Sequence, residues 1–165
     1  MSWRGSTTVS DRIFASLPYL LPLIEVIILE LKTCQKFSSC LLVDFPVIRF
    51  VLSPLRPLVE IYNIPYVGLI IFFALFLLVV RNEKISHFIR FNTMQAILLD
   101  IIIFLFSILT DVVGVIVNGG FATQTLSTTI FIGIIVAVVY SIAQSLLGRY
   151  AEIPAVSDAV YMQVR

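Results

Sequence analysis

The segment GLIIFFALFLLVV, from Gly68 to Val80, decides the fold class, because it carries neither a charge nor a polar side chain. A helix needs about 20 mostly apolar residues to cross a hydrocarbon core of about 30 Å. Extended back to residue 64, the segment approaches that length. It therefore predicts a helix that crosses a membrane.

Three further segments are long and apolar enough to cross, and they cover residues 13–31, 96–117 and 129–147 approximately. The whole chain is 59% hydrophobic and 13% charged, with a mean hydropathy of +1.05, whereas soluble domains carry about 25% charged residues. We therefore expect an all-α integral membrane protein with four transmembrane helices, in which residues 1–165 form a single membrane domain.

The connection between the first two spans contains the sequence FPVIRFVLSPLRPLVEIYN, residues 45–63. Three prolines break any long helix, and charged residues interrupt the apolar runs. The pattern predicts short amphipathic pieces that lie in the membrane interface. A purely structural linker is the alternative interpretation.

The charges of the other two connections differ and indicate an orientation. RNEKISHFIRFN carries three basic residues, while NGGFATQTLS carries no charge. Short loops rich in Lys and Arg stay on the side of synthesis. With four spans, both termini and the middle loop are expected on the inner side. The net charge of +1 gives no indication of a nucleic-acid partner.

Polar residues recur along one strip of the third span. At about 100° per residue, the strip contains Asp100, Ser107, Asp111 and Asn118, with Asp111 expected deepest in the membrane. Asn92 and Gln95 are expected to turn inward at the helix entry. Carboxylates within a membrane usually face a bundle interior or a water-filled cavity. The strip is either the wall of a polar pathway or a packing seam.

The first and fourth spans carry matching candidates. Gly133, Ala137 and Ser141 have the spacing that lets two helices approach closely, and Tyr140 and Gln144 are expected on the same side. In the first span, two prolines predict a kink. Glu25 on that helix is a candidate for lining a cavity, or a helix-paired carboxylate.

Catalysis and metal binding have little support in the sequence. Cys34 and Cys40 are the two cysteines, and with the single His87 they form no recognisable zinc ligand set. Two incidental thiols are the favoured interpretation over a disulfide or a redox pair. There is no familiar pairing of nucleophile and base and no phosphate-binding loop, so we expect no enzyme activity and no cofactor.

The run RFNTMQAILLD, residues 90–100, resembles the signature of the Tic family's twenty-kilodalton component, a subunit of the translocon at the inner envelope membrane of chloroplasts. Three other stretches agree in the same order: DRIFASLPYLLPL, SPLRPLVEIYNIPY and AEIPAVSDAVYMQV. The matching motif residues are Arg90, Phe91, Asn92, Gln95 and Asp100.

The resemblance implies a four-helix subunit of the preprotein import apparatus, which contributes to a protein-conducting channel or to its assembly. It implies both termini on the stromal side of the inner envelope, or on the cytoplasmic side of a bacterial cell membrane. The implied partners are other inner-envelope subunits, the outer-envelope translocon, preproteins in transit and membrane lipid. The N-terminal sequence lacks a transit peptide, which favours a plastid-encoded or bacterial homologue.

Two other functions remain open from the residues alone. Asp111, Glu25 and the kinked first span are compatible with a small solute or ion permease. A membrane scaffold, in which every buried polar group pairs with another subunit, is the second alternative.

Overall fold

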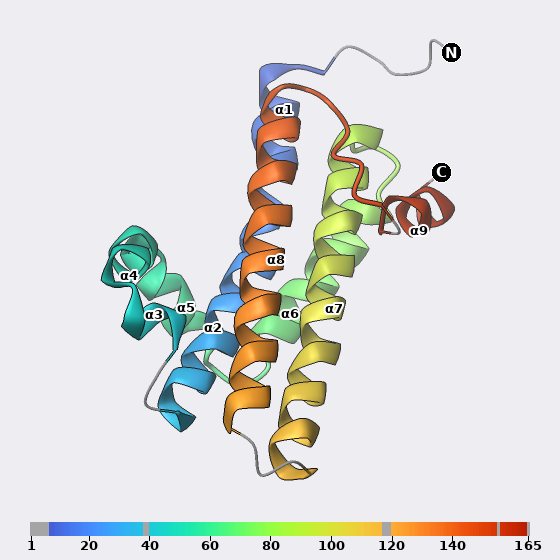
Figure 1. Cartoon of the computed structure of the whole chain (residues 1–165). Coiled ribbons are helices and arrows are strands. Elements are labelled where there is room, and N and C mark those ends of the chain that lie inside the picture. The colour runs from blue at the N-terminus through green and yellow to red at the C-terminus, as the bar shows by residue number, and fades with distance from the viewer. Residues whose placement is uncertain (1–6, 38–39, 117–119, 155, 165) are drawn as a thin grey trace.

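The computed structural model describes residues 7–37, 40–116, 120–154 and 156–164. Three long helical stretches lie side by side and contact one another in every pair (Figure 1). Within these residues, three helices are long and apolar enough to cross a membrane, and a fourth span is reached if one bent helix pair counts as a single span. The expected all-α membrane fold is therefore confirmed. The three stretches are α1 with α2 (Val9–Ser16 and Leu20–Lys36), α7 (His87–Ile116) and α8 (Gly120–Leu146).

The first stretch runs through its prolines without a break. Thr8 and Asp11 form a capping box at the start of α1, in which each side chain binds the other's backbone N–H. Pro18 stands in the 3₁₀ turn η1 (Leu17–Tyr19), and Pro22 stands in the first turn of α2. A missing N–H costs little at such positions. The chain is consequently helical from residue 9 to residue 36.

The segment between α2 and α7 leaves the bundle and then returns to it. In Figure 1, the short helices α3 (Leu41–Asp44), α4 (Pro46–Leu52) and α5 (Arg56–Tyr62) project sideways, with the 3₁₀ turn η2 (Ser53–Leu55) between the last two. The return is made by α6 (Val67–Ala74) and the π-helical η3 (Leu75–Val80).

The two parts of this segment, Pro46–Tyr62 and Val67–Val80, meet at an angle of 97°. Tyr66 turns the chain there with a left-handed φ of 69°. Pro46, Pro54 and Pro57 each stand at the start of a helical element, where proline is tolerated. The expected Pro-broken segment is confirmed as part of this bent pair.

Helices α7 and α8 begin earlier than the apolar segments near residues 96 and 129 suggested. The added turns contain polar residues that find partners within the molecule. Thr93 Oγ1 donates to the Ile89 carbonyl at 2.8 Å, and Thr129 Oγ1 donates to the Thr125 carbonyl at 2.7 Å. These bonds satisfy the hydroxyl groups inside the helix, so hydropathy alone underestimates its length.

An aromatic cluster holds the C-terminal helix α9 (Val156–Gln163) against the start of α7. The Phe91 ring is fully buried and lies 4.9 Å from the centroids of both Tyr150 and Tyr161. Phe88 meets Tyr150 edge to face at 5.2 Å. Such pairs add to the free energy gained by burial alone, and they fix the C-terminal segment to the bundle.

A disulfide joins Cys34 near the end of α2 to Cys40 at the N-cap of α3. Their Cα atoms are 5.2 Å apart, within the range that a disulfide needs. The interpretation of these cysteines as incidental thiols is therefore wrong. The chain turns back after α2 and brings Cys40 onto the last turns of that helix, which sequence spacing did not reveal.

Gly148 supports a testable prediction, because it follows α8 with a left-handed φ of +72°. A Cβ atom there would lie 2.6 Å from Thr7 Oγ1. We expect Gly148→Ala to lower the free energy of unfolding by about 1–2 kcal/mol, the cost of a left-handed L-residue. Thermal unfolding of the purified protein in detergent measures this loss.

Gly133→Ala is the matched control. A Cβ at Gly133 meets no atom within 4 Å, and alanine favours a helix more than glycine does. The control is expected to melt at the wild-type temperature or above it. Equal melting temperatures for the two variants would contradict the assignment of backbone strain at Gly148.

Candidate functional site

One buried amide connects three segments of the bundle. Asn92 Oδ1 on α7 accepts a hydrogen bond from Tyr19 Oη at 3.0 Å and another from Ser145 Oγ on α8 at 2.9 Å. Its Nδ2 donates to the Phe88 carbonyl at 2.8 Å. Asn92, Tyr19 and Ser145 are all fully buried. Asn92 thus turns inward as expected, and its contacts are those of helix packing.

Gln95 lies one turn further along α7 and is also fully buried. Its Nε2 donates a long hydrogen bond of 3.4 Å to Ser141 Oγ on α8, while its Oε1 has no hydrogen-bond partner. A buried amide oxygen without a partner is costly. Gln95 is therefore packed in the seam between α7 and α8, but less completely satisfied than Asn92.

A second polar group lies toward the other end of the bundle, around Glu30 of α2. Glu30 is fully buried, accepts from Ser127 Oγ of α8 at 2.8 Å, and accepts from the Leu41 backbone N–H at 3.2 Å. Thr33 Oγ1 lies 2.9 Å from the same Ser127 hydroxyl. The carboxylate therefore ties α2 to α8 and to the start of α3.

Sequence reasoning missed Glu30 and selected Glu25. A signal was available, because Glu30 follows Tyr19 by eleven residues, which returns to within about 20° of the same helix face at 100° per residue. Glu30 also lies within 4.8 Å of the sulfur atoms of Cys34 and Cys40, measured between possible ligand atoms. The disulfide already engages both sulfurs, so this group offers no thiolate to a metal.

Glu25, Tyr62 and Asp100 form a third polar group, and this one is incompletely satisfied. All three side chains are partly buried. A Cβ at Gly68 of α6 would lie 3.0 Å from the Tyr62 ring and 3.2 Å from Glu25 Oε1, so these two side chains border the same backbone position. Asp100 lies close enough to Glu25 and Tyr62 to interact with both electrostatically. Buried Asp100 Oδ1 and Tyr62 Oη have no hydrogen-bond partner.

Several predicted residues lie elsewhere. Asp111 is exposed in the last two turns of α7, so it does not turn into the bundle interior. The helix extends back to His87, and Asp100 is consequently nearer its middle. Ser107 is half-buried, and its carbonyl accepts from Thr110 at 2.8 Å. Asn118 lies outside the described residues.

The predicted close seam on α8 is also corrected. Gly133 is exposed with open space around it, and Tyr140 is 41% exposed, while Gln144 is half-buried. Ser141 of the predicted seam is buried, and it shares the inward face of α8 with Thr123, Ser127, Ile134, Val138 and Ser145. On α7, Ile97 is buried at 1% exposure.

Arg90 of the family motif has a structural role at the start of α7. Its Nε donates to the Val80 carbonyl at 2.8 Å. Val80 ends η3, where backbone carbonyls lack partners within the helix. Arg90 therefore fixes the end of η3 to the beginning of α7.

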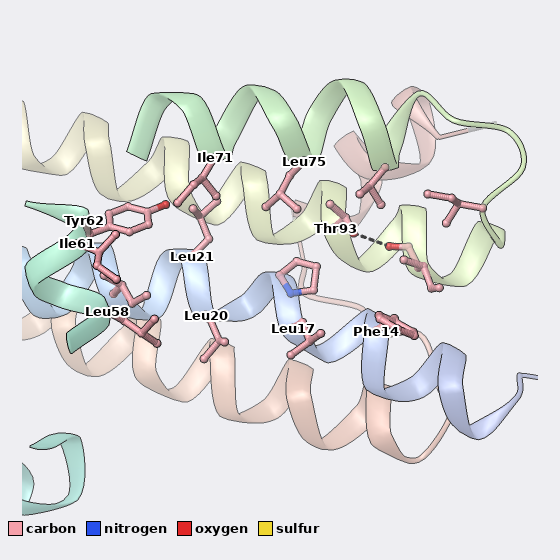
Figure 2. Close-up of a pocket in the computed structure, with 15 residues that line it drawn as sticks. Phe14, Leu17, Leu20, Leu21, Leu58, Ile61, Tyr62, Ile71, Leu75 and Thr93 are labelled. Carbon is pink, nitrogen blue, oxygen red and sulfur yellow. Dashed lines mark hydrogen bonds between the residues drawn. The ribbon is translucent and has the colours of Figure 1, made fainter. Parts of the chain in front are cut away.

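An apolar groove of about 500 Å³ lies between α1–α2, α5, α6 with η3, and the start of α7. Figure 2 shows its two long walls, with Leu17 and Leu21 on one side and Ile71 and Leu75 on the other. The one hydroxyl of its middle part belongs to Thr93, which donates within its own helix. At Tyr62 the groove reaches the group formed with Glu25 and Asp100.

Asn92 provides a test of the packing role. We expect Asn92→Leu to lower the free energy of unfolding by roughly 1–3 kcal/mol, because the hydroxyls of Tyr19 and Ser145 lose their acceptor. Gln144→Leu, at a half-buried position outside this network, is the matched control and should leave stability nearly unchanged. Melting temperatures in detergent compare the two, and equal losses would argue against a special role for Asn92.

Comparison with known proteins assigns this arrangement to a family. The family described as "Chloroplast import apparatus Tic20-like" matches residues 9–160. The chain is 44% identical over 167 residues to a "Tic20 family protein" of Synechocystis sp., an alignment that covers 100% of this chain and 99% of the relative.

Two plastid-containing organisms have further relatives. "Tic20 family protein Ycf60" of Porphyra purpurea is 33% identical over 166 residues, covering 97% of this chain and 78% of the relative. "Protein TIC 20-II, chloroplastic" of Arabidopsis thaliana is 30% identical over 162 residues, covering 96% and 74%. The chain belongs to the Tic20 family.

Proposed function

We propose that this protein is a subunit of a preprotein import translocon and that it contacts the preprotein along the apolar groove. The chain belongs to a family described as "Chloroplast import apparatus Tic20-like", which supports the translocon role. Relatives named as chloroplastic proteins agree with it. The protein acts without catalysing a reaction, as a structural and conducting component.

The groove carries this proposal, because its chemistry complements that of a transit peptide. Its walls are apolar, and at Tyr62 it meets the carboxylates of Glu25 and Asp100. Lys32 attracts Glu25, whereas Asp100 Oδ1 has no hydrogen-bond partner. Transit peptides are amphipathic, rich in Arg and poor in acidic residues. An apolar face fits the groove, and a basic side chain fits the two carboxylates.

The bundle interior is less suited to conduction. Its buried polar residues form hydrogen bonds between helices, from Ser145 to Asn92 and from Ser127 to Glu30. Such bonds are typical of a packing seam. A conducting path therefore runs along the outside of this chain and is completed by other inner-envelope subunits. A solute or ion permease gains no support, since the groove walls offer almost no polar group to a solute.

The protein belongs, on this proposal, in the plastid inner envelope, or in the cell membrane of a cyanobacterium. Both termini are on the stromal or cytoplasmic side, as the basic middle loop indicates. The disulfide gives independent support. Cys34 and Cys40 lie at the end of α2 remote from the N-terminus, and disulfides are rare on the reducing side of a membrane.

Photocrosslinking in native membranes during precursor translocation tests the groove. A photoreactive amino acid is placed at Leu17 or at Ile71 in the groove walls. It is placed separately at Leu105 or Val139, which are exposed elsewhere on the bundle. We expect crosslinks to the moving precursor from the groove positions and none from the control positions. Crosslinks from the groove only to resident subunits would contradict preprotein contact and leave an assembly role.

Neutral variants separate conduction from assembly. Glu25→Gln combined with Asp100→Asn should reduce precursor crosslinking while the translocon complex stays assembled on a native gel. Asp111→Asn is the control, because this carboxylate is exposed near the end of α7 and away from the groove. Suppose instead that less complex assembles and that the complex which does assemble crosslinks to the precursor as the wild type does. The carboxylates would then have no role in preprotein contact.

Thiol labelling tests the orientation. In sealed vesicles with the native orientation, a membrane-impermeant maleimide should label Cys34 and Cys40 from outside only after reduction, because the disulfide blocks both sulfurs. A C-terminal tag should stay protected from external protease. Labelling that requires opening of the vesicles would reverse the orientation.

A further inference from the structure

A second pocket, separate from the groove, lies on the other side of the projecting helices. It has a volume of about 420 Å³ and is formed by α2 together with α3, α4, η2 and α5. Its floor is apolar and contains Ile27, Leu42 and Val59, which are all buried. Its rim contains Arg49, Arg56 and Glu60, which are all exposed.

The two arginines of the rim have no side-chain partner in the part of the chain that the structure describes. Among the described residues, neither Arg49 nor Arg56 makes a hydrogen bond or an ion pair. Glu60 follows Arg56 by one helical turn and leaves the rim net positive. Two guanidinium groups that border one pocket repel each other unless an anion lies between them. Guanidinium groups bind phosphate and similar groups through paired hydrogen bonds.

The surroundings of the pocket identify the source of the anion. The outer surface of the projecting helices is strongly apolar, with Val47, Phe50 and Val51 exposed at 66–79%. In a membrane protein such a surface lies against lipid. A soluble phosphate would satisfy the arginines but would leave the apolar floor empty, whereas a lipid supplies both an anionic headgroup and an acyl chain.

We infer that this pocket binds an anionic membrane lipid, with its charged headgroup held by Arg49 and Arg56 and an acyl chain on the floor formed by α2, α3 and α5. The site does not depend on the translocon role, because it is formed on a different face from the groove. The bound lipid adds to the contacts that hold the projecting helices against α2, namely the Cys34–Cys40 disulfide, the hydrogen bond from the Leu41 N–H to Glu30, and the packing of Leu42 and Val59 in the core.

Native mass spectrometry of the purified full chain tests this site. The protein is exposed to equal amounts of phosphatidylglycerol and phosphatidylcholine with identical acyl chains, and the lipid retained after detergent removal is counted. We expect phosphatidylglycerol to be retained in preference. Arg49→Gln and Arg56→Gln should each reduce this preference about fivefold, the usual contribution of one basic residue at a membrane surface, and the double variant should abolish it.

The control is the double variant Arg81→Gln with Lys84→Gln, which removes the same charge from the loop after η3. It should keep the wild-type preference. Equal retention of the two lipids by the wild type would overturn the inference. Equal loss in both double variants would also overturn it, because the preference would then depend on net charge alone.

A floor variant distinguishes a lipid from a free anion. Leu52→Trp fills the pocket from α4 and should reduce retention of both lipids, while the arginines stay in place. Soluble glycerol phosphate should not compete with phosphatidylglycerol. If it competes fully, the site binds an anion without the acyl chain and the lipid assignment fails. Melting temperatures show whether each variant has kept its fold.

Discussion

The amide of Asn92 is the constraint on which the bundle depends. One oxygen accepts from Tyr19 and from Ser145, so α7 can meet the other two long stretches in only one register. In lipid, apolar surfaces alone do not select a register, since acyl chains are as apolar as leucine. Hydrogen bonds between helices are directional and supply the selection. The hydrogen bond from Ser127 to Glu30 joins α8 to α2 in the same way near the opposite end of the bundle. The apolar layers between these two polar groups then pack in a defined order.

Hydropathy and the positions of proline were enough to predict an all-helical membrane protein with a broken connection, because both depend on local chemistry. The interior was predictable only where a motif residue such as Asn92 turned inward. Asp111 lies near the end of α7 and Asp100 nearer its middle, because the helix begins at His87, which the apolar pattern alone did not indicate. Glu30 was missed because its partners, Ser127 and the Leu41 backbone, come from distant segments. The disulfide depended on a chain reversal that spacing alone does not encode.

The projecting helices and the return through α6 and η3 give the molecule two unlike faces. α2 borders both the apolar groove and the pocket with the arginine rim. α5 lies between the two cavities and contributes different residues to each. Tyr62 and Leu58 face the groove, while Arg56 and Glu60 face the pocket. The alternation follows from the helical repeat of α5. A shift of α5 along α2 would therefore change both cavities together.

The return helix is shorter than the membrane that surrounds it. The eight residues of α6 and the six of η3 rise by only about 20 Å, against a hydrocarbon core of about 30 Å. Lipid beside this helix has to thin, or a neighbouring subunit has to cover the difference. Where the lipid thins, the apolar barrier beside the groove is locally reduced.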